Sequence, residues 1–122
     1  GFIPHDELGS LFARAHFTVI PSIAYENAPT TIGESFFAGV PVIASRIGGI
    51  PELVRDGFDG FLFTPGNEAE LKQALEKARS AVWKNLHEGA CQSASEFSLP
   101  GYITALQNLC PVVEFRQVPV VE

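Results

Sequence analysis

One short stretch, flanked by two apolar runs, constrains this chain more than any other feature. The stretch carries a glutamate at each end and reads Glu26-Asn27-Ala28-Pro29-Thr30-Thr31-Ile32-Gly33-Glu34. The apolar runs, residues 17–20 and 41–44, have the length of buried strands. The pattern therefore predicts a strand, a turn, a short helix and a second strand, the arrangement in which α/β domains bind ligands at the carboxyl ends of parallel strands.

The predicted helix start suits an anion, and the two carboxylates suit hydroxyl groups. A helix N-terminus offers free backbone N–H groups to a phosphate. Because Pro29 lacks an N–H, we expect the useful donors at Thr30, Thr31 and Ile32. A carboxylate accepts hydrogen bonds from a pair of hydroxyls, such as a sugar or a ribose presents. Phosphate and hydroxyls together indicate a nucleotide-activated sugar as the ligand.

Further short motifs stand at fixed distances from this stretch. They are Pro21-Ser22, Gly39-Val40-Pro41-Val42-Ile43-Ala44, Gly48-Gly49, Pro51-Glu52, Gly57, Gly60 and Phe61-Leu62-Phe63. With Glu26 and Glu34 as an E-x7-E element, they resemble the donor-binding domain of the group 1 (family 4) glycosyltransferases, although that family usually has Ala where this chain has Ser35. The resemblance runs in order over residues 1–63 and more loosely to residue 109.

The resemblance implies a role for each part of the stretch. Glu34 is expected to accept hydrogen bonds from the two ribose hydroxyls of the nucleotide, and Glu26 to contact hydroxyls of the transferred sugar near its anomeric carbon. A negative charge at Glu26 also favours the positive charge that develops as the glycosidic bond breaks. The intervening backbone is expected to present N–H groups to the pyrophosphate; its residues are Asn27, Ala28, Pro29, Thr30 and Thr31. Because the family needs no bound metal, neither a metal nor another cofactor is expected.

Each of these features also has a purely structural interpretation. Thr31 and Glu34 have the spacing of a capping box, in which the Glu34 carboxylate bonds back to the backbone N–H of Thr31. Glu26 precedes a turn, where it is alternatively a solvated loop carboxylate, and the helix start is alternatively an ordinary capped terminus. Ser22, at a strand end, is a further candidate for lining the site.

Hydrophobic spacing and end signals predict the remaining elements. We expect helices over residues 4–15, 29–38 and 81–95 and from Asn67 and Ser98 onward, a helical turn at 52–55, and strands at 16–20, 41–44 and 61–63. Leu11 should lie on the buried face of the first helix, and five aromatic residues are expected in the core: Phe36, Phe37, Phe61, Phe63 and Trp83. Gly39 should end the second helix, and Gly48-Gly49 should form a turn. The tail at 112–121 is expected to be a strand, an arm or disordered.

Strands that alternate with helices predict a parallel sheet with right-handed crossovers. The expected fold class is therefore α/β, a Rossmann-like three-layer α/β/α arrangement. A full doubly wound sheet has about six strands, so we expect residues 1–122 to be the C-terminal half of the donor domain of a two-domain GT-B protein. The resemblance then implies that the acceptor domain, and the upstream Arg and Lys with which the family neutralises the departing diphosphate, lie outside these residues. The isolated chain should therefore be inactive.

The composition excludes several kinds of partner. The net charge of −6, from 14 acidic and 8 basic residues without a basic cluster, argues against nucleic acid and anionic membranes. No apolar run approaches the length of a membrane-spanning helix, so a soluble, cytoplasmic protein is expected. Cys91 and Cys110 are expected as free thiols, and the three histidines lack the spacing of a zinc site.

The function that these features favour is the binding of a nucleoside diphosphate sugar within a retaining glycosyltransferase, which transfers a hexose to an unidentified acceptor. Two other functions remain open. One is a non-catalytic nucleotide-sugar-binding or scaffold module, and the other is a different GT-B enzyme such as a nucleotide-sugar epimerase. If the strand at 16–20 lacks a neighbour, its apolar edge should also make the chain self-associate, which light scattering would detect.

Overall fold

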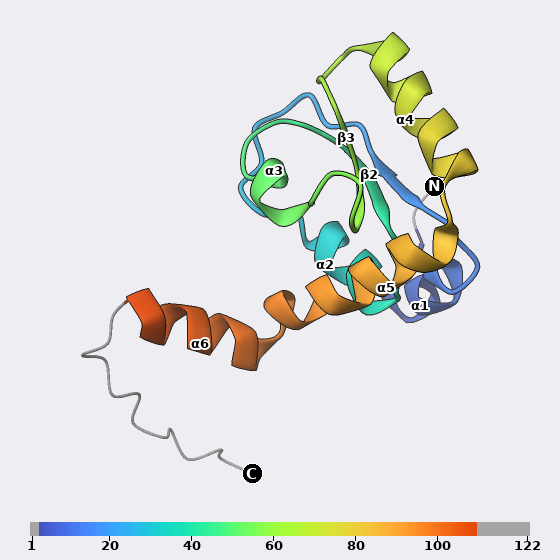
Figure 1. The fold of residues 1–122 in the computed structure, drawn as a ribbon. Helices are drawn as coiled ribbons and strands as arrows, with labels where there is room; N and C mark the ends of the chain where they lie inside the picture. Colours follow the sequence, from blue (N-terminus) through green and yellow to red (C-terminus); the bar gives the residue numbers. More distant parts are fainter. Residues whose placement is uncertain (1–2, 110–122) are drawn as a thin grey trace.

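The computed structural model describes residues 3–109 as an alternation of helices and short strands (Figure 1). The elements in chain order are α1 (His5–Phe12), β1 (Thr18–Ile20), α2 (Thr30–Phe37), β2 (Val42–Ser45), α3 (Ile50–Leu53), β3 (Gly60–Phe63), α4 (Glu68–Ser80), α5 (Trp83–Ala94), η1 (Ser95–Phe97) and α6 (Leu99–Leu109). Every predicted helix and strand within these residues is present, with shifted ends. Cys110 and the tail at 112–121 lie outside the described residues.

The three strands form one parallel sheet in the order β1-β2-β3. Ile20 of β1 lies beside Ala44 of β2, and Ser45 of β2 lies beside Phe63 of β3. The carboxyl ends of the strands therefore meet at one edge of the sheet, and the loops that follow them lie close together. This arrangement confirms the predicted Rossmann-like α/β class.

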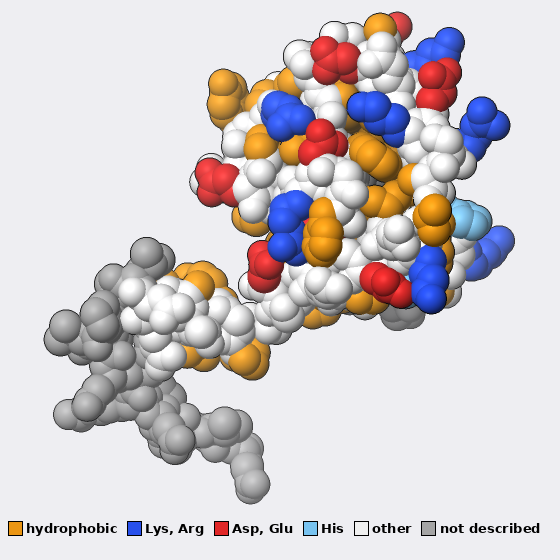
Figure 2. All heavy atoms as spheres, viewed as in Figure 1, with side chains coloured by type: hydrophobic (Ala, Val, Ile, Leu, Met, Phe, Trp, Pro, Cys, Tyr) orange, Lys and Arg blue, Asp and Glu red, His pale blue; other side chains and the backbone are white. Residues whose placement is uncertain are grey.

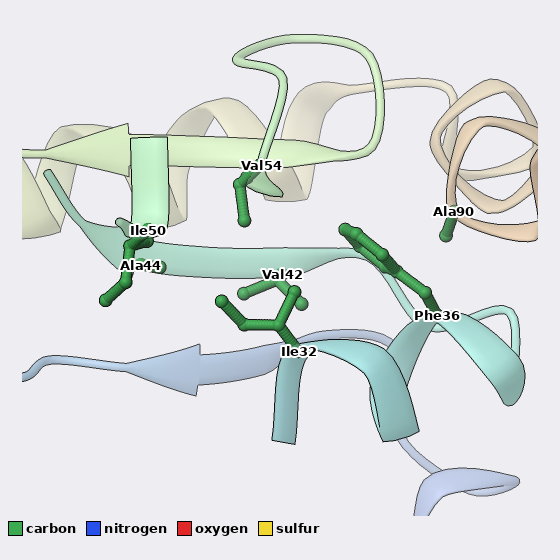
Figure 3. Close-up of a cluster of buried hydrophobic side chains, with 7 residues drawn as sticks. All are labelled: Ile32, Phe36, Val42, Ala44, Ile50, Val54 and Ala90. Carbon is green, nitrogen blue, oxygen red and sulfur yellow. The ribbon is translucent and has the colours of Figure 1, made fainter. Parts of the chain in front are cut away.

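Strand β2 forms the centre of the core, because helices cover both of its faces. The first cluster, on the face covered by α2 and α5, consists of Ile32, Phe36, Val42, Ala44, Ile50, Val54 and Ala90 (Figure 3). The second cluster, on the face covered by α4, consists of Ile43, Phe63, Ala74 and Ala78. All four β2 residues are buried, which is typical of a central strand in a parallel sheet.

Helix α2 ends at a glycine, as predicted. Gly39 has a φ of +70° and follows the C-cap residue Ala38. The Gly39 N–H donates to the Phe36 carbonyl (2.9 Å), and the Val40 N–H donates to the Ser35 carbonyl (2.8 Å). These two bonds make a Schellman motif, which satisfies the last carbonyls of the helix and turns the chain towards β2.

Ser35, where the resemblance leads one to expect alanine, joins α2 to the sheet. Its side chain is fully buried, its hydroxyl donates to the Val40 carbonyl (2.7 Å), and its oxygen lies 2.8 Å from Oγ1 of Thr18 in β1. Because the single hydroxyl hydrogen of Ser35 is used on Val40, Thr18 is the donor in the second bond. The serine therefore adds a polar link between helix and strand that alanine lacks.

Strand β1 is an edge strand of the described sheet, and the prediction that it is buried is wrong. It has strand geometry only over Thr18–Ile20, and Val19 is 42% exposed. The cause is its position, because β2 covers one side of β1 and no described strand covers the other. The self-association expected at this edge stays a prediction.

Three apolar residues that were expected in the interior are exposed. They are Leu11 (49%), Phe37 (62%) and Trp83 (37%). Phe37 follows the buried Phe36 by one residue, so a helical rotation turns it away from the sheet. Leu11 lies on α1, but the face of α1 that lines the hollow against α2 contains Leu8 and Phe12 and not Leu11. The indole N–H of Trp83, the first residue of α5, donates to the His16 carbonyl (2.9 Å), so this residue links the start of α5 to the segment before β1 rather than filling the core.

The surface in Figure 2 shows acidic and basic side chains interspersed, without a large patch of one sign on the visible face. Helix α6 extends away from the sheet and packs mainly on η1 (Figure 1). Within residues 3–109, no helix combines the length and the apolar character needed to cross a membrane.

A buried carboxylate that the sequence analysis missed joins the connection before β3 to α5. Asp59 is fully buried and accepts hydrogen bonds from the Arg55 N–H (2.7 Å) and the Ser93 hydroxyl (2.6 Å). The Arg55 guanidinium also lies 3.2 Å from this carboxylate. Since both carboxylate oxygens have donors, the cost of burying the charge is offset.

Helix α4 begins as predicted, with Asn67 as its N-cap. The Asn67 side-chain oxygen accepts from the Glu70 N–H (3.1 Å). In return, the Glu70 carboxylate accepts from the side-chain amide of Asn67 (2.9 Å) and from the Thr64 N–H (2.8 Å). The hydrogen bond from the Thr64 backbone lowers the pKa of Glu70 below its ordinary value, because it favours the charged form.

We predict that Glu70→Gln lowers the free energy of unfolding at neutral pH. The difference in this free energy between the variant and the wild type should become smaller in acid. A carboxyl group whose pKa is lowered by folding contributes stability above its unfolded-state pKa, and this contribution is lost as the pH falls through the folded-state pKa. Urea denaturation over this pH range measures the difference, with the exposed Glu76→Gln as the control. An equal loss at every pH would contradict the assignment.

Candidate functional site

The loop that follows β1 holds the first of the two motif glutamates. The Ser22 hydroxyl lies 2.9 Å from Oε1 of Glu26, and the Ala24 N–H lies 3.3 Å from the Ser22 oxygen. Glu26 is half-buried. The carboxylate is therefore held in place at the carboxyl edge of the sheet, and it is not the freely solvated side chain of the alternative interpretation.

The Gly48-Gly49 turn, which follows β2, packs directly on the backbone of this loop. The Gly49 N–H donates to the Glu26 carbonyl (2.9 Å). A Cβ atom at Gly48 would collide with the Glu26 carbonyl oxygen, and one at Gly49 would collide with the Asn27 carbonyl oxygen. Gly48 also has a φ of +57°, which glycine adopts without strain. The predicted turn is present, and its role is to let two backbone segments approach closely.

The N-terminus of α2 faces the same edge with unused donors. The helix begins at Thr30, after the N-cap residue Pro29, and no side chain caps it. The Ile32 N–H already donates to the Pro29 carbonyl (3.1 Å), and the Ile32 side chain is fully buried in the core. Within residues 3–109, the N–H groups of Thr30 and Thr31 have no backbone or side-chain acceptor. Two of the three expected donors are therefore available to an anion.

The second motif glutamate does not form the capping box. Because Pro29 is the N-cap, Thr31 is already inside the helix, and the Glu34 carboxylate makes no hydrogen bond or ion pair to another described residue. The side chain is half-buried. It borders a hollow of about 610 Å³ between α1 and α2, whose other lining residues are Leu8, Gly9, Phe12, Ala13, Phe37 and Ala38. Glu34 is thus an unpartnered carboxylate beside an apolar groove.

The two arginines between β2 and β3 are already paired with carboxylates. Arg46, which directly follows β2, lies 3.3 Å from the Asp56 carboxylate, and Arg55 pairs with Asp59. Within the part of the chain that the structure describes, neither Glu26 nor Glu34 forms an ion pair. The positive potential that this segment offers an anion therefore comes mainly from the N-terminal end of α2.

The structure brings some of the predicted site residues together and leaves others apart. Ser22, Glu26 and the Gly48-Gly49 turn are in contact. Asn27 and Ala28 are exposed between this cluster and the helix start. Glu34 lies four residues after Thr30, which places it about 6 Å further along the helix axis. None of the described hollows is lined by both glutamates.

Several curated proteins are similar to this chain in sequence. A D-inositol 3-phosphate glycosyltransferase of Streptomyces bingchenggensis is 35% identical over 94 residues, covering 75% of this chain and 20% of that protein. The sulfoquinovosyl transferase SQD2 of Arabidopsis thaliana is 37% identical over 85 residues, covering 67% of this chain and 16% of that protein. The chain thus spans about a fifth or less of the length of these two relatives.

Solved structures share the fold. Sucrose-phosphate synthase from Thermosynechococcus elongatus matches with a TM-score of 0.76 and 26% identity, covering 89% of this chain and 28% of that one. HepE of Anabaena, in complex with UDP-glucose, matches with a TM-score of 0.70 and 28% identity, covering 84% of this chain and 29% of that one.

The family model described as "Glycosyl transferases group 1" matches residues 1–84, which include β1, α2, β2 and both motif glutamates. The match covers well over half of the chain and agrees with the sequence relatives and with the shared fold. This chain belongs to the group 1 glycosyl transferases.

Proposed function

We propose that this chain is the nucleotide-sugar-binding part of a retaining glycosyltransferase, which transfers a hexose from a nucleoside diphosphate to an acceptor. The observation that carries the proposal is the order of three groups along one segment, each with at least one free hydrogen-bonding position. The unpartnered Glu34 carboxylate comes first, the free N–H groups of Thr30 and Thr31 come next, and the Glu26 carboxylate follows. A nucleoside diphosphate sugar presents a diol, two phosphates and a second set of hydroxyls in the same order.

Glu34 is the proposed ligand of the ribose. A vicinal diol offers two O–H donors, which match the two acceptor oxygens of one carboxylate. Its half-buried position beside the groove favours such bonds over bonds to water, because partial exclusion of water strengthens charge-assisted hydrogen bonds. A ribose bound at Glu34 would direct the base towards α1.

The helix start is the proposed site of the diphosphate. The Thr30 and Thr31 N–H groups supply donors, and the α2 macrodipole adds about 0.3–1 kcal/mol for an anion at an exposed helix end. The buried side chains of Ile32 and Phe36 fix this helix on the sheet (Figure 3). The donors are therefore held in place before the ligand binds, which reduces the ordering cost of binding.

Glu26 is the proposed sugar ligand. As the bond from the anomeric carbon to the diphosphate oxygen breaks, positive charge develops on the sugar ring, and a nearby carboxylate stabilises it. The acceptor oxygen then bonds to the anomeric carbon on the face that the diphosphate leaves, its proton passes to the departing diphosphate, and the configuration is retained. The HepE structure with UDP-glucose supports a glucosyl or related hexosyl donor.

The remaining parts of the reaction are proposed to come from outside residues 1–122. Among the described residues, the two arginines between β2 and β3 do not supply the cations that neutralise the departing diphosphate, since Arg46 and Arg55 are paired with Asp56 and Asp59. The acceptor is expected to bind to a second domain. We propose that no metal is required, because N–H groups and basic side chains supply the positive charge, and that the protein acts in the cytoplasm.

We predict that Glu34→Gln in the whole protein raises the Kd for UDP by about tenfold, the loss of roughly one charge-assisted hydrogen bond. The same change should abolish the preference of the wild type for UDP over 2′-deoxy-UDP, because the carboxylate that recognises the 2′-hydroxyl is gone. Isothermal titration measures both values. Glu76→Gln, on the exposed face of α4, is the matched control. An unchanged preference between the two nucleotides would refute a ribose role for Glu34.

We also predict that Gly49→Ala in the whole protein reduces sugar transfer by about tenfold or more, since misplacing a reacting group by about 1 Å costs up to ~100-fold. The added Cβ would push the Glu26-Asn27 backbone away. Gly57→Ala is the control, because Gly57 has a φ of +80° but open space around it. If both substitutions reduce transfer equally, general strain rather than displacement of the loop is the cause.

A further inference from the structure

The loop between β1 and α2 is not held by hydrophobic packing. Its two large apolar residues, Ile23 and Tyr25, are 77% and 88% exposed. Burial of apolar surface is the usual anchor for a loop of this kind, and here it is missing at these positions. Something else must fix the position of Glu26, which lies directly after Tyr25 in the sequence.

Hydrogen bonds fix this loop at two points of Glu26. The backbone carbonyl of Glu26 accepts from the Gly49 N–H (2.9 Å). The side-chain oxygen Oε1 lies 2.9 Å from the Ser22 hydroxyl. A carboxylate can only accept, so Ser22 must be the donor in this bond.

The Ser22 hydroxyl is itself oriented by the backbone. The Ala24 N–H lies 3.3 Å from Oγ of Ser22, within donating distance. The Ala24 carbonyl also lies 3.3 Å from Oγ, but Oε1 of Glu26 is the closer, charged acceptor at 2.9 Å, so the single hydroxyl hydrogen points at Glu26 while the oxygen accepts from the Ala24 N–H. Hydrogen bonds in such a chain polarise one another, so the donor to Glu26 is strengthened. One carboxylate oxygen of Glu26 is occupied in this way, and Oε2 has no described partner.

We propose that Ser22 is a positioning residue for the transferase reaction, which orients the Glu26 carboxylate so that Oε2 faces the transferred sugar. This inference rests on the proposed function. Ser22 does not touch the substrate. It occupies Oε1 and fixes the side-chain rotation of Glu26, so that the second oxygen meets the sugar hydroxyls or the charge at the anomeric carbon without reorganisation. Preorganised charge of this kind acts mainly on the transition state.

The test uses the whole protein that contains this chain, with UDP-glucose as donor and the acceptor that supports the highest rate. Ser22→Ala removes the donor, and Ser22→Thr keeps a hydroxyl at the same Cβ. We expect Ser22→Ala to lower kcat by about tenfold, the loss of one oriented hydrogen bond to a charged group. We expect Ser22→Thr to restore most of the rate. The Kd for UDP should be unchanged in both variants, because UDP lacks the sugar.

A double substitution separates positioning from general damage. Ser22→Ala combined with Glu26→Ala should be no slower than Glu26→Ala alone, because the hydroxyl acts only through the carboxylate. The proposal is overturned if Ser22→Ala leaves kcat unchanged, if Ser22→Thr fails to restore it, or if the two effects add. If Glu26→Ala itself leaves the transfer rate unchanged, the proposed sugar-binding role of Glu26 fails as well. If Glu26→Ala lowers the rate and Ser22→Ala does not, the role of Glu26 stands and only the role of Ser22 fails.

Discussion

The close contact between two backbone segments, Glu26-Asn27 and Gly48-Gly49, is the constraint on which the candidate site depends. It exists because β1 and β2 are parallel and in register, with Ile20 beside Ala44, so that the loops after both strands leave the sheet at neighbouring points. The segments can touch only where neither has a side chain in between, and the glycine pair meets this condition. One loop thereby supports the other, and the Glu26 carboxylate lies at the carboxyl edge, where parallel sheets bind ligands.

The second part of the site depends on how α2 is fixed. The core contacts of Ile32 and Phe36 hold one face of the helix on the sheet, and the Schellman motif at Gly39 sets the point at which the chain returns to β2 (Figure 3). Because Gly39 fixes the C-terminal end of α2 and the core contacts fix its side, the direction of the first turn of α2 is determined. Helix packing and the proposed anion binding therefore use the same short element, and a change to either is expected to affect the other.

Much of this arrangement could be predicted from the sequence, because local signals and the fold agree. Three local signals each specify a geometry that is present in the structure: the apolar run at 41–44, the glycine at 39 and the Asn67 cap. The predicted capping box is not formed, because Pro29 is the N-cap residue of α2 and Thr31 therefore already lies inside the helix. The exposure of Phe37 could not be foreseen, since it depends on which faces other elements cover. The Ser22–Glu26 bond and the buried Asp59 depend on loop and tertiary geometry that periodicity does not encode.

We propose a single geometry, in which the nucleoside diphosphate lies along α2 with the sugar next to Glu26. A crystal structure of the whole protein with UDP-glucose tests it most directly. We expect ribose hydroxyls within hydrogen-bonding distance of the Glu34 carboxylate, phosphate oxygens on the Thr30 and Thr31 N–H groups, and the hexose beside Glu26. A bound nucleotide elsewhere, with these N–H groups facing solvent, would contradict it.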